Sequence, residues 1–541
     1  MLGLLRSRVV GGATPAPATR AYSATIQFIA GIGCVVAAAP APAENWRLSA
    51  SAGATETYTS NANYSERSLA EGDFVTSISG VLNIRGEGAR LKLNGSIAGT
   101  GTFYVGQSQN NSFAPQVSLA GTLEAIEKFA YVEARASVSQ TFLSPFGAQP
   151  ANLANATQNR YTQQTYSVSP YIQGVLGSSN VSYSLRDDNY WTVASSFGNS
   201  SANVPNTYSN NLVGSMSSPV NPWGWTLEYS RFYYDNGIKD VADVGQGATT
   251  TQIVRLILPY QIDPQLQISA RVGYEKDQFP LRTTQDTIYG AGLQWSPTSR
   301  TQVGGFWEER FFGSSYSANI NHRLPNAALS ASFSRGLTSY PQLALAIPAG
   351  ATVTQFLDAA FTSRIPDPAE RAVAIEQFLI RTGLPPTLAS PVNFYAATLT
   401  LQQSATVSLV LIGALNSVTF SLFNTTSEAI SAAGNVLPPA LQFGQNNTQT
   451  GGGISFSHQL SGFTNLGASA TYSTTTVNAS TGPLANARSN NGNASLSLGT
   501  QFGPKTSGSA GVSYSQSRFT GGTDLGTSSA LNVFASVNHT F

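Results

Sequence analysis

The sequence predicts an all-β protein, a single transmembrane antiparallel up-and-down β-barrel of about 22 strands, within a range of about 16 to 24. Three observations predict this fold class. Apolar and polar residues alternate with period two along most of the chain, and short and long connections follow one another. The third is composition: 41% of the residues are hydrophobic and only 10% are charged, against roughly 25% charged in an average soluble domain.

The period-two alternation recurs from Trp46 onward, interrupted by Gly, Asn and Ser. It is clear in LKLNGSI (91–97), LQISARVGY (266–274) and ASLSLGT (494–500), where apolar residues such as Leu91, Leu93 and Ile97 alternate with polar ones. Such alternation is typical of a sheet with one apolar and one polar face.

The connections between these segments fall into two classes. Tight breaks lie near residues 86–88, 126–128, 177–178, 218–222, 261–264, 297–299, 325–326, 414–416, 460–462 and 503–505. Between them lie mostly longer polar stretches, such as 60–72, 107–115, 145–162, 199–206, 432–448 and 474–490. Turns at one end and loops at the other are what an outer-membrane barrel requires, with periplasmic turns and extracellular loops.

The N-terminus resembles a secretory signal. Arg6, Arg8 and Arg20 precede the apolar run IQFIAGIGCVVAAA (26–39), and APA follows at 41–43. We expect a signal peptide at 1–43, cleaved after Ala43, and a barrel formed by residues 44–541. No later segment reaches the ~18 consecutive apolar residues of a membrane-spanning helix.

Cys34 is the only cysteine and lies inside the apolar run of the predicted signal peptide. The alternative, a lipoprotein with Cys34 as the lipidated residue, is disfavoured because Gly31 stands where an aliphatic residue is wanted. A mature chain without thiols suits an oxidising periplasm and excludes disulfides and thiol catalysis.

The chain ends in LNVFASVNHTF (531–541). Phe541, Val537 and Val533 fall on the side that would meet lipid, and Phe534 falls on the inner side. This pattern resembles the signal that the barrel-assembly machinery recognises, although His539 stands where Tyr or an aliphatic residue is commoner. We expect the strand to close the barrel against the one that begins near Trp46.

One long connection departs from the strand pattern. In the loop insert 339–391, a short helix is expected near 368–382, with Asp367 as N-cap, Glu370 completing a capping box and Gly383 at the C-terminal end. Its apolar stripe must pack against something. The insert is extracellular by the alternation, and it either folds back into the lumen as a plug, covers the mouth or packs on neighbouring loops.

Charged residues gather at two places on predicted strands. Arg85, Arg90 and Lys92 surround the first tight turn, and Arg186, Asp187 and Asp188 follow one another farther along. We expect them to face water, because an ion on the lipid face costs roughly 2–4 kcal/mol at the bilayer midplane. They are candidate lumen charges that set an ion preference, with solvated rim charges as the alternative.

No pattern points to catalysis or to a metal. His322, His458 and His539, the only histidines, all lie near tight turns or the terminus, and their spacing favours interfacial positions over metal ligands. GxSxG, phosphate-loop and HExxH motifs are absent from the sequence. We therefore expect no enzymatic activity and no cofactor, and the net charge of +1 argues against nucleic acid as a partner.

Several stretches resemble one known family, the outer-membrane β-barrel proteins associated with PEP-CTERM/exosortase systems and exopolysaccharide gene clusters. They are ETYTSN (56–61), GDFVTSISGVLNIRGEGARLKLNGSI (72–97), VEARASVSQTFLSPFG (132–147) and SRIPDPAERAVAIEQFLIRTGLP (363–385). The resemblance implies the outer membrane of a Gram-negative bacterium, with outer-membrane lipid and exopolysaccharide or its export components as partners. It supplies no catalytic motif.

The expected function is a non-enzymatic conduit or surface platform linked to exopolysaccharide or PEP-CTERM protein export. The alternatives are a barrel-anchored structural or adhesive surface protein acting through its loops, and a general diffusion porin. A soluble secreted β-propeller or solenoid is a third. A barrel of this strand number is too wide for wall side chains to fill, so its lumen is either open or plugged.

Overall fold

The computed structural model describes residues 45–196, 204–237, 248–279, 282–345, 399–430, 446–478, 487–521 and 526–541. Between 346 and 398 it describes residues 357, 358, 361, 365, 371, 374, 375 and 388–396. The predicted signal peptide at 1–43 lies outside the described residues.

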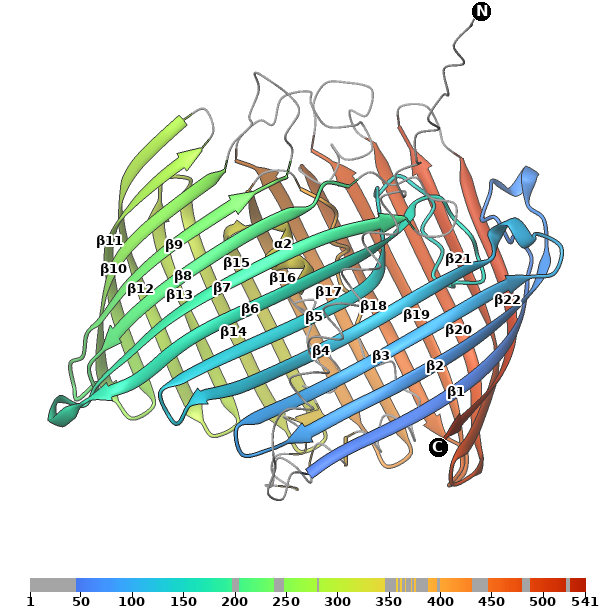
Figure 1. The fold of residues 1–541 in the computed structure, drawn as a ribbon, viewed down its shortest axis with the longest axis horizontal. Coiled ribbons are helices and arrows are strands. Elements are labelled where there is room, and N and C mark those ends of the chain that lie inside the picture. Colours follow the sequence, from blue (N-terminus) through green and yellow to red (C-terminus); the bar gives the residue numbers. More distant parts are fainter. Residues whose placement is uncertain are drawn as a thin grey trace, which may run out of the picture. The chain divides into compact units, whose positions relative to one another are not determined.

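Residues 45–541 form a barrel of 22 antiparallel strands, which confirms the predicted fold class (Figure 1). The strands are β1 (Asn45–Thr59), β2 (Asp73–Glu87), β3 (Leu91–Tyr104), β4 (Ser112–Ile126), β5 (Ala130–Phe142), β6 (Arg160–Leu176), β7 (Val181–Ser196), β8 (Thr207–Ser217), β9 (Thr226–Asp235), β10 (Thr249–Asp263), β11 (Leu266–Phe279), β12 (Arg282–Thr298), β13 (Thr301–Arg310), β14 (Gly313–Leu324), β15 (Ala327–Thr338), β16 (Thr400–Ile412), β17 (Asn416–Ala429), β18 (Asn447–Gln459), β19 (Thr464–Val477), β20 (Arg488–Gly503), β21 (Thr506–Thr520) and β22 (Thr527–Thr540). The short helices whose bounds lie within the described residues are η1 (Arg67–Leu69), η2 (Ser108–Asn110), η3 (Gly177–Ser179) and α2 (Tyr340–Leu345).

Each strand pairs with its neighbours in sequence, and β22 pairs with β1 to close the sheet. The closing register runs from Ser51 opposite Thr540 to Thr59 opposite Asn532. Beyond it, the backbone N–H of Phe541 donates to the carbonyl of Ala50 at 2.9 Å. The predicted pairing of the last strand with the strand that begins near Trp46 is therefore confirmed.

The turns lie where the sequence predicts them. All ten tight breaks overlap the connections that join β2 to β3, β4 to β5 and so on to β20 and β21. These connections share one end of the barrel, the turn end, while the longer loops lie at the other, the loop end (Figure 1). Among the described residues, no helix is long and apolar enough to cross a membrane.

The two faces of the sheet differ as the alternation predicts. Val533 and Val537 project outward and are each 52% exposed. Asn532, on the opposite face of the same strand, points into the barrel and is 1% exposed. Leu422, Ile454 and other large apolar side chains repeat this outward pattern around the barrel. An apolar band of this kind is what the hydrocarbon region of a membrane covers.

The long insert differs from expectation at both ends. It spans residues 339–399 rather than 339–391, because 391–396 (PVNFYA) pack inside the barrel and form no ladder. Its first residues form α2, which the sequence analysis did not predict. Arg371, Ala374 and Ile375 are helical, but the predicted caps Asp367, Glu370 and Gly383 lie outside the described residues.

Candidate functional site: the occupied lumen

The insert, residues 339–399, enters the barrel at the loop end. Tyr340 of α2 is buried against β6, where its hydroxyl lies 2.6 Å from that of Tyr161 and donates to Oε1 of Gln163 at 2.5 Å. The ring of Tyr395, from the last part of the insert, packs edge-on against Tyr340 at 5.4 Å. Burial raises the pKa of both Tyr340 and Tyr395, so these phenols stay neutral hydrogen-bonding groups.

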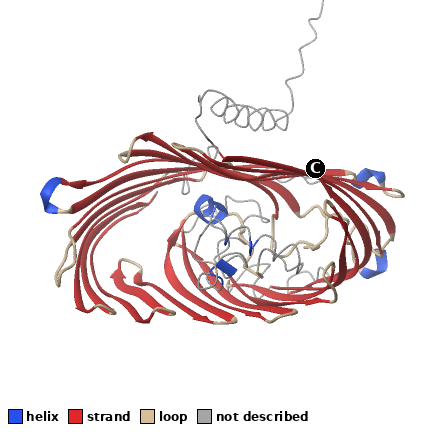
Figure 2. Cartoon of the chain, turned by 90° about the horizontal axis from the view of Figure 1, so that it is seen from below, coloured by secondary structure: helices blue, strands red, loops and turns tan. Residues whose placement is uncertain are grey.

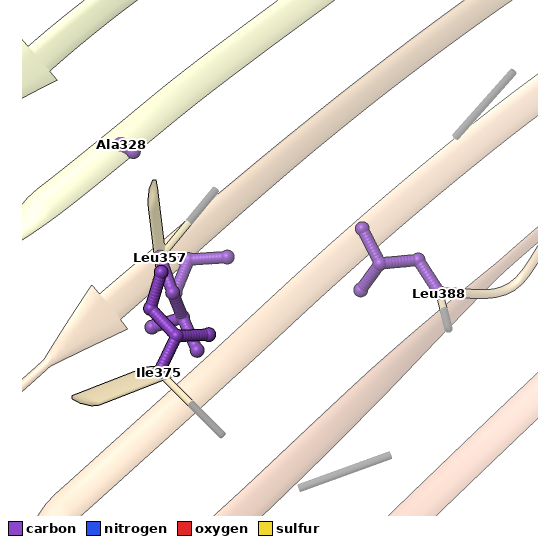
Figure 3. Close-up of a cluster of buried hydrophobic side chains, with 5 residues drawn as sticks. Ala328, Leu357, Ile375 and Leu388 are labelled. Carbon is purple, nitrogen blue, oxygen red and sulfur yellow. The ribbon is translucent and has the colours of Figure 1, made fainter. Parts of the chain in front are cut away.

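The insert then reaches the turn end of the lumen. Leu357 and Ile375 are 0% and 2% exposed and form a cluster with Ala328 of β15 and Val410 of β16 (Figure 3). Ala328 lies ten residues from Thr338, where the insert begins, so the cluster is roughly 33 Å along the strand from the loop end.

The returning part of the insert is hydrogen-bonded to two separate strands of the wall, β18 and β9. Gln449 on β18 makes two hydrogen bonds with the backbone of Val392, one accepting from N–H at 3.0 Å and one donating to the carbonyl at 2.9 Å. On β9, the hydroxyl of Tyr234 donates to the carbonyl of Ala396 at 2.8 Å. Within the insert, Arg371 and Asp358 form an ion pair at 2.6 Å. The insert therefore folds back into the lumen, one of the three arrangements that the sequence left open.

A second segment, the β5–β6 loop (residues 143–159), also folds inward. Its Asn155 is fully buried and donates to Oγ1 of Thr59 at 2.8 Å and to the carbonyl of Asn61 at 2.9 Å. Asn532 of β22 donates to Oδ1 of Asn155 at 3.0 Å. This loop therefore bonds to both strands of the closing pair. Seen along the barrel, helical and loop pieces lie inside the ring of strands (Figure 2).

The lumen-facing wall of β15 to β22 is neutral. Its inward positions carry Ser, Thr, Asn, Gln, Gly, Ala and a few larger apolar residues. The charged residues of these strands are Arg335, Glu428, Arg488 and Arg518, which alternate onto the outer face. Hydroxyl pairs join neighbouring strands along this neutral wall: Ser332 to Thr406 at 2.6 Å, Ser469 to Ser495 at 2.7 Å and Ser509 to Ser536 at 2.7 Å.

A hollow of about 350 Å³ lies in the neutral wall at the turn end of β19 to β22. Amides and hydroxyls line it together with one exposed aromatic ring: Asn465, Gln501, Asn538, Ser497, Ser509 and Phe463. Its lining contains donors, acceptors and no charged side chain.

The wall of β9 to β13 is different and carries buried ion pairs. Arg255 on β10 contacts Glu228 on β9 at 2.5 Å and Glu308 on β13 at 2.8 Å, and Arg271 on β11 contacts Glu308 at 2.6 Å. Arg310 pairs with the fully buried Glu275 at 2.7 Å. These charges neutralise one another on this charged wall.

We expect Glu308→Gln to lower the free energy of unfolding by roughly 3–5 kcal/mol, because it leaves two buried guanidinium groups without their shared counter-charge. The Glu308 side chain is 2% exposed, and those of Arg255 and Arg271 are 10% and 14% exposed. Urea unfolding in detergent micelles, followed by tryptophan fluorescence, measures the difference.

The matched control is Glu309→Gln. Glu309 is the next residue, faces outward and accepts a hydrogen bond from Ser314 at 2.9 Å. Its loss should change stability by about 1 kcal/mol or less. Equal effects of the two substitutions would contradict the assignment of the ion-pair network.

The structure separates the six charges that the sequence singled out. Arg85 pairs with Glu87 at 3.2 Å on the lumen side near the turn end, where Lys92 faces Glu87 and Arg90 lies in the turn. Arg186 and Asp188 face the lumen, where Arg186 also contacts Glu133 at 2.6 Å.

Asp187 differs from the expectation that all these charges face water. It lies between Arg186 and Asp188, so the alternation turns it to the outer face. There its carboxylate accepts hydrogen bonds from Asn189 at 3.0 Å and Asn210 at 2.6 Å. Two amide donors therefore satisfy a charge that otherwise meets lipid or its headgroups.

The three histidines lie on the outer face near the turn end. Nδ1 of each contacts a polar side chain on the paired strand: Thr301 for His322 at 2.9 Å, Asn416 for His458 at 2.6 Å and Thr506 for His539 at 2.9 Å. In the part of the chain that the structure describes, no group of acidic, His or Cys side chains is arranged to hold a metal ion.

Sequence reasoning missed the charged wall, although the signal was present. Each charged residue of this wall is next in sequence to an outward Tyr or Val, so the alternation alone turns it inward. These residues are Glu228, Arg255, Arg271 and Glu275. The same alternation could have predicted the neutral wall of β15 to β22. Neither the hollow nor the partners of each charge follow from the sequence.

No protein-family model matches the chain, and no curated protein matches it. Solved structures that match the chain include the siderophore receptor PirA from Pseudomonas aeruginosa, with 9% identity over 92% of this chain and 80% of that one and a TM-score of 0.40. Another is PirA from Acinetobacter baumannii, with 10% identity over 91% and 80% and a TM-score of 0.43. The FrpB iron transporter from Neisseria meningitidis has 8% identity over 91% and 82% and a TM-score of 0.43.

The closed antiparallel sheet, its apolar outer face and its turn and loop ends define the class of protein. It is a β-barrel of the outer membrane of a Gram-negative bacterium.

Proposed function

We propose that the protein is a non-enzymatic conduit for hydroxyl-rich carbohydrate, closed at rest by its own insert. The neutral wall is the observation that carries this proposal. Across β15 to β22 it offers hydroxyl and amide groups to the lumen and no charged side chain from the strands.

Such a wall suits a saccharide chain. Sugar hydroxyls both donate and accept hydrogen bonds, as do Ser, Thr, Asn and Gln, so one set of contacts exchanges for another as the chain advances. The hollow at the turn end, at about 350 Å³, lies within the roughly 300–1,000 Å³ range of ligand pockets and combines amides with Phe463. The resemblance to the exopolysaccharide-associated family supports the same substrate class and an association with exopolysaccharide or PEP-CTERM protein export.

A second candidate is a surface platform for which the barrel serves as an anchor. The two inward-folded segments favour it, because Asn155 and the Tyr340 cluster bond them tightly to the wall. In that case the loops would bind polysaccharide and nothing would pass. A general diffusion porin is disfavoured, since it needs an unobstructed lumen.

The test is flux of labelled oligosaccharides into proteoliposomes, with Ser495→Glu compared with Ser495→Gln. Ser495 lies on the neutral wall, hydrogen-bonded to Ser469 at 2.7 Å, and the two replacements have nearly the same size. With the insert removed, the conduit predicts that a neutral hexasaccharide enters and that the glutamate selectively slows a uronic-acid oligomer of equal length. Polysaccharide binding by intact cells without any flux would instead support the platform.

A further inference from the structure

Two arginines lie on the outer face of the β20–β21 hairpin. Arg488 and Arg518 are both exposed, and neither forms an ion pair within the described residues. Their outward direction is fixed by their neighbours. Ser517, beside Arg518, faces inward, where its hydroxyl contacts Tyr64 and the backbone N–H of Gln149.

The register brings the two cations close together. Arg488 pairs with Thr520 and Asn490 pairs with Arg518, so the arginines are diagonal neighbours across the hairpin. Diagonal side chains of this kind begin about 7–8 Å apart. Two positive charges at this separation repel each other, and an anion between them would convert the repulsion into attraction.

Polar groups hold one of these guanidinium groups in place. Nε of Arg488 donates to Oδ1 of Asn490 at 3.1 Å, and its Nη2 lies 3.5 Å from Oγ1 of Thr474. The hydroxyl of Tyr472 donates to the same Asn490 oxygen at 3.2 Å. These contacts leave other N–H groups of Arg488 available to a ligand on the outer surface. The guanidinium group of Arg518 makes no hydrogen bond within the described residues.

The pair lies at the height of lipid headgroups. Tyr472 and Tyr514 project outward at 56% and 44% exposure, and apolar residues such as Leu496 and Val512 follow toward the turn end. Aromatic rings of this kind mark the membrane interface of a barrel. Arg488 and Arg518 lie on the loop-end side of these rings, which is the extracellular side.

We propose that Arg488 and Arg518 form a binding site for a phosphate group of the phosphorylated glycolipid in the outer leaflet. Guanidinium groups bind phosphate oxygens through paired, charge-assisted hydrogen bonds. The site is independent of the lumen and of what the conduit carries. A lipid held there would cover the hairpin next to the closing strand β22.

The experiment uses the full chain in nanodiscs, with bisphosphorylated lipid A as the probe and native mass spectrometry as the readout. The wild-type barrel should retain the lipid after delipidating wash, and Arg488→Gln/Arg518→Gln should weaken retention about tenfold or more. Added salt should weaken wild-type retention as well. Heat-dependent gel mobility identifies folded barrels in each sample.

The control is Lys505→Gln, which removes a cation from the turn of the same hairpin at the opposite end and should leave retention unchanged. A second control is dephosphorylated lipid A with the same acyl chains. The wild-type barrel should retain it as weakly as the double variant retains bisphosphorylated lipid A. Equal retention of the dephosphorylated lipid, equal retention by the double variant, or displacement by millimolar inorganic phosphate alone would each overturn the proposal.

Discussion

Replacing residues 340–398 with a short Gly/Ser linker is expected to convert a closed barrel into an open channel. In planar bilayers the full chain should show no steady conductance, and the shortened chain should show large unitary steps. The reason is the path of the insert, which contacts Tyr161 at the loop end and Ala328 and Val410 at the turn end. Wall side chains alone do not fill a barrel of 22 strands.

The sheet should tolerate this deletion. Thr338 and Thr400 already face each other as a register pair, so a hairpin connection joins β15 to β16 without moving either strand. Leu357→Asp/Ile375→Asp, which keeps the full length, is the matched variant and should open the channel part of the time. Folded shortened protein that still fails to conduct would mean that the insert does not close the lumen.

A disulfide between the insert and the wall is expected to hold the channel closed. A Cβ built on Gly453 of β18 would lie 3.0 Å from Cβ of Ala389, close to the roughly 3.5–4.5 Å that a disulfide spans. The chain's one cysteine, Cys34, lies in the predicted signal peptide, so no other thiol of the barrel competes. Ala389→Cys/Gly453→Cys should therefore crosslink on oxidation.

Sub-denaturing urea distinguishes the locked from the free insert. Where the structure describes the insert, its backbone makes fewer hydrogen bonds to the barrel than the strands make to each other, so it should leave the lumen before the sheet unfolds. Conductance should then appear in the wild type and in the reduced double variant but not in the oxidised one. Ala389→Cys and Gly453→Cys singly are the controls, and conductance of the fully oxidised protein in urea would contradict a lumen closed by this segment.

The strand number and the turn positions could be predicted because they are local. A strand of a barrel between lipid and water shows its two faces as a period of two, and each short turn interrupts that period. Tight breaks such as Pro325-Asn326 needed no knowledge of distant residues. The face on which Asp187 lies is also a local property, because its outward position follows from the alternation along β7.

The insert illustrates the limit of this reasoning. Its helical pattern required an apolar partner surface. Leu357 and Ile375 pack on Ala328 and Val410. These two residues belong to the strands that flank the insert in sequence, but they lie at the turn end, far from the point where the insert enters. A stripe of apolar residues specifies that a surface must be covered and not which surface. The β5–β6 loop is similar, because Asn155 bonds to the first and the last strand of the sheet, β1 and β22.

By itself, the sequence determined the closed barrel, its 22 strands, the outward direction of Val533 and Val537 and the neutrality of the wall from β15 to β22. Each of these depends on the order of apolar and polar residues along one strand. Only the tertiary structure decided that the lumen is occupied, that Arg255 is shared between Glu228 and Glu308, and that Arg488 and Arg518 are neighbours. Those features depend on register and on contacts between distant segments, which local periodicity does not encode.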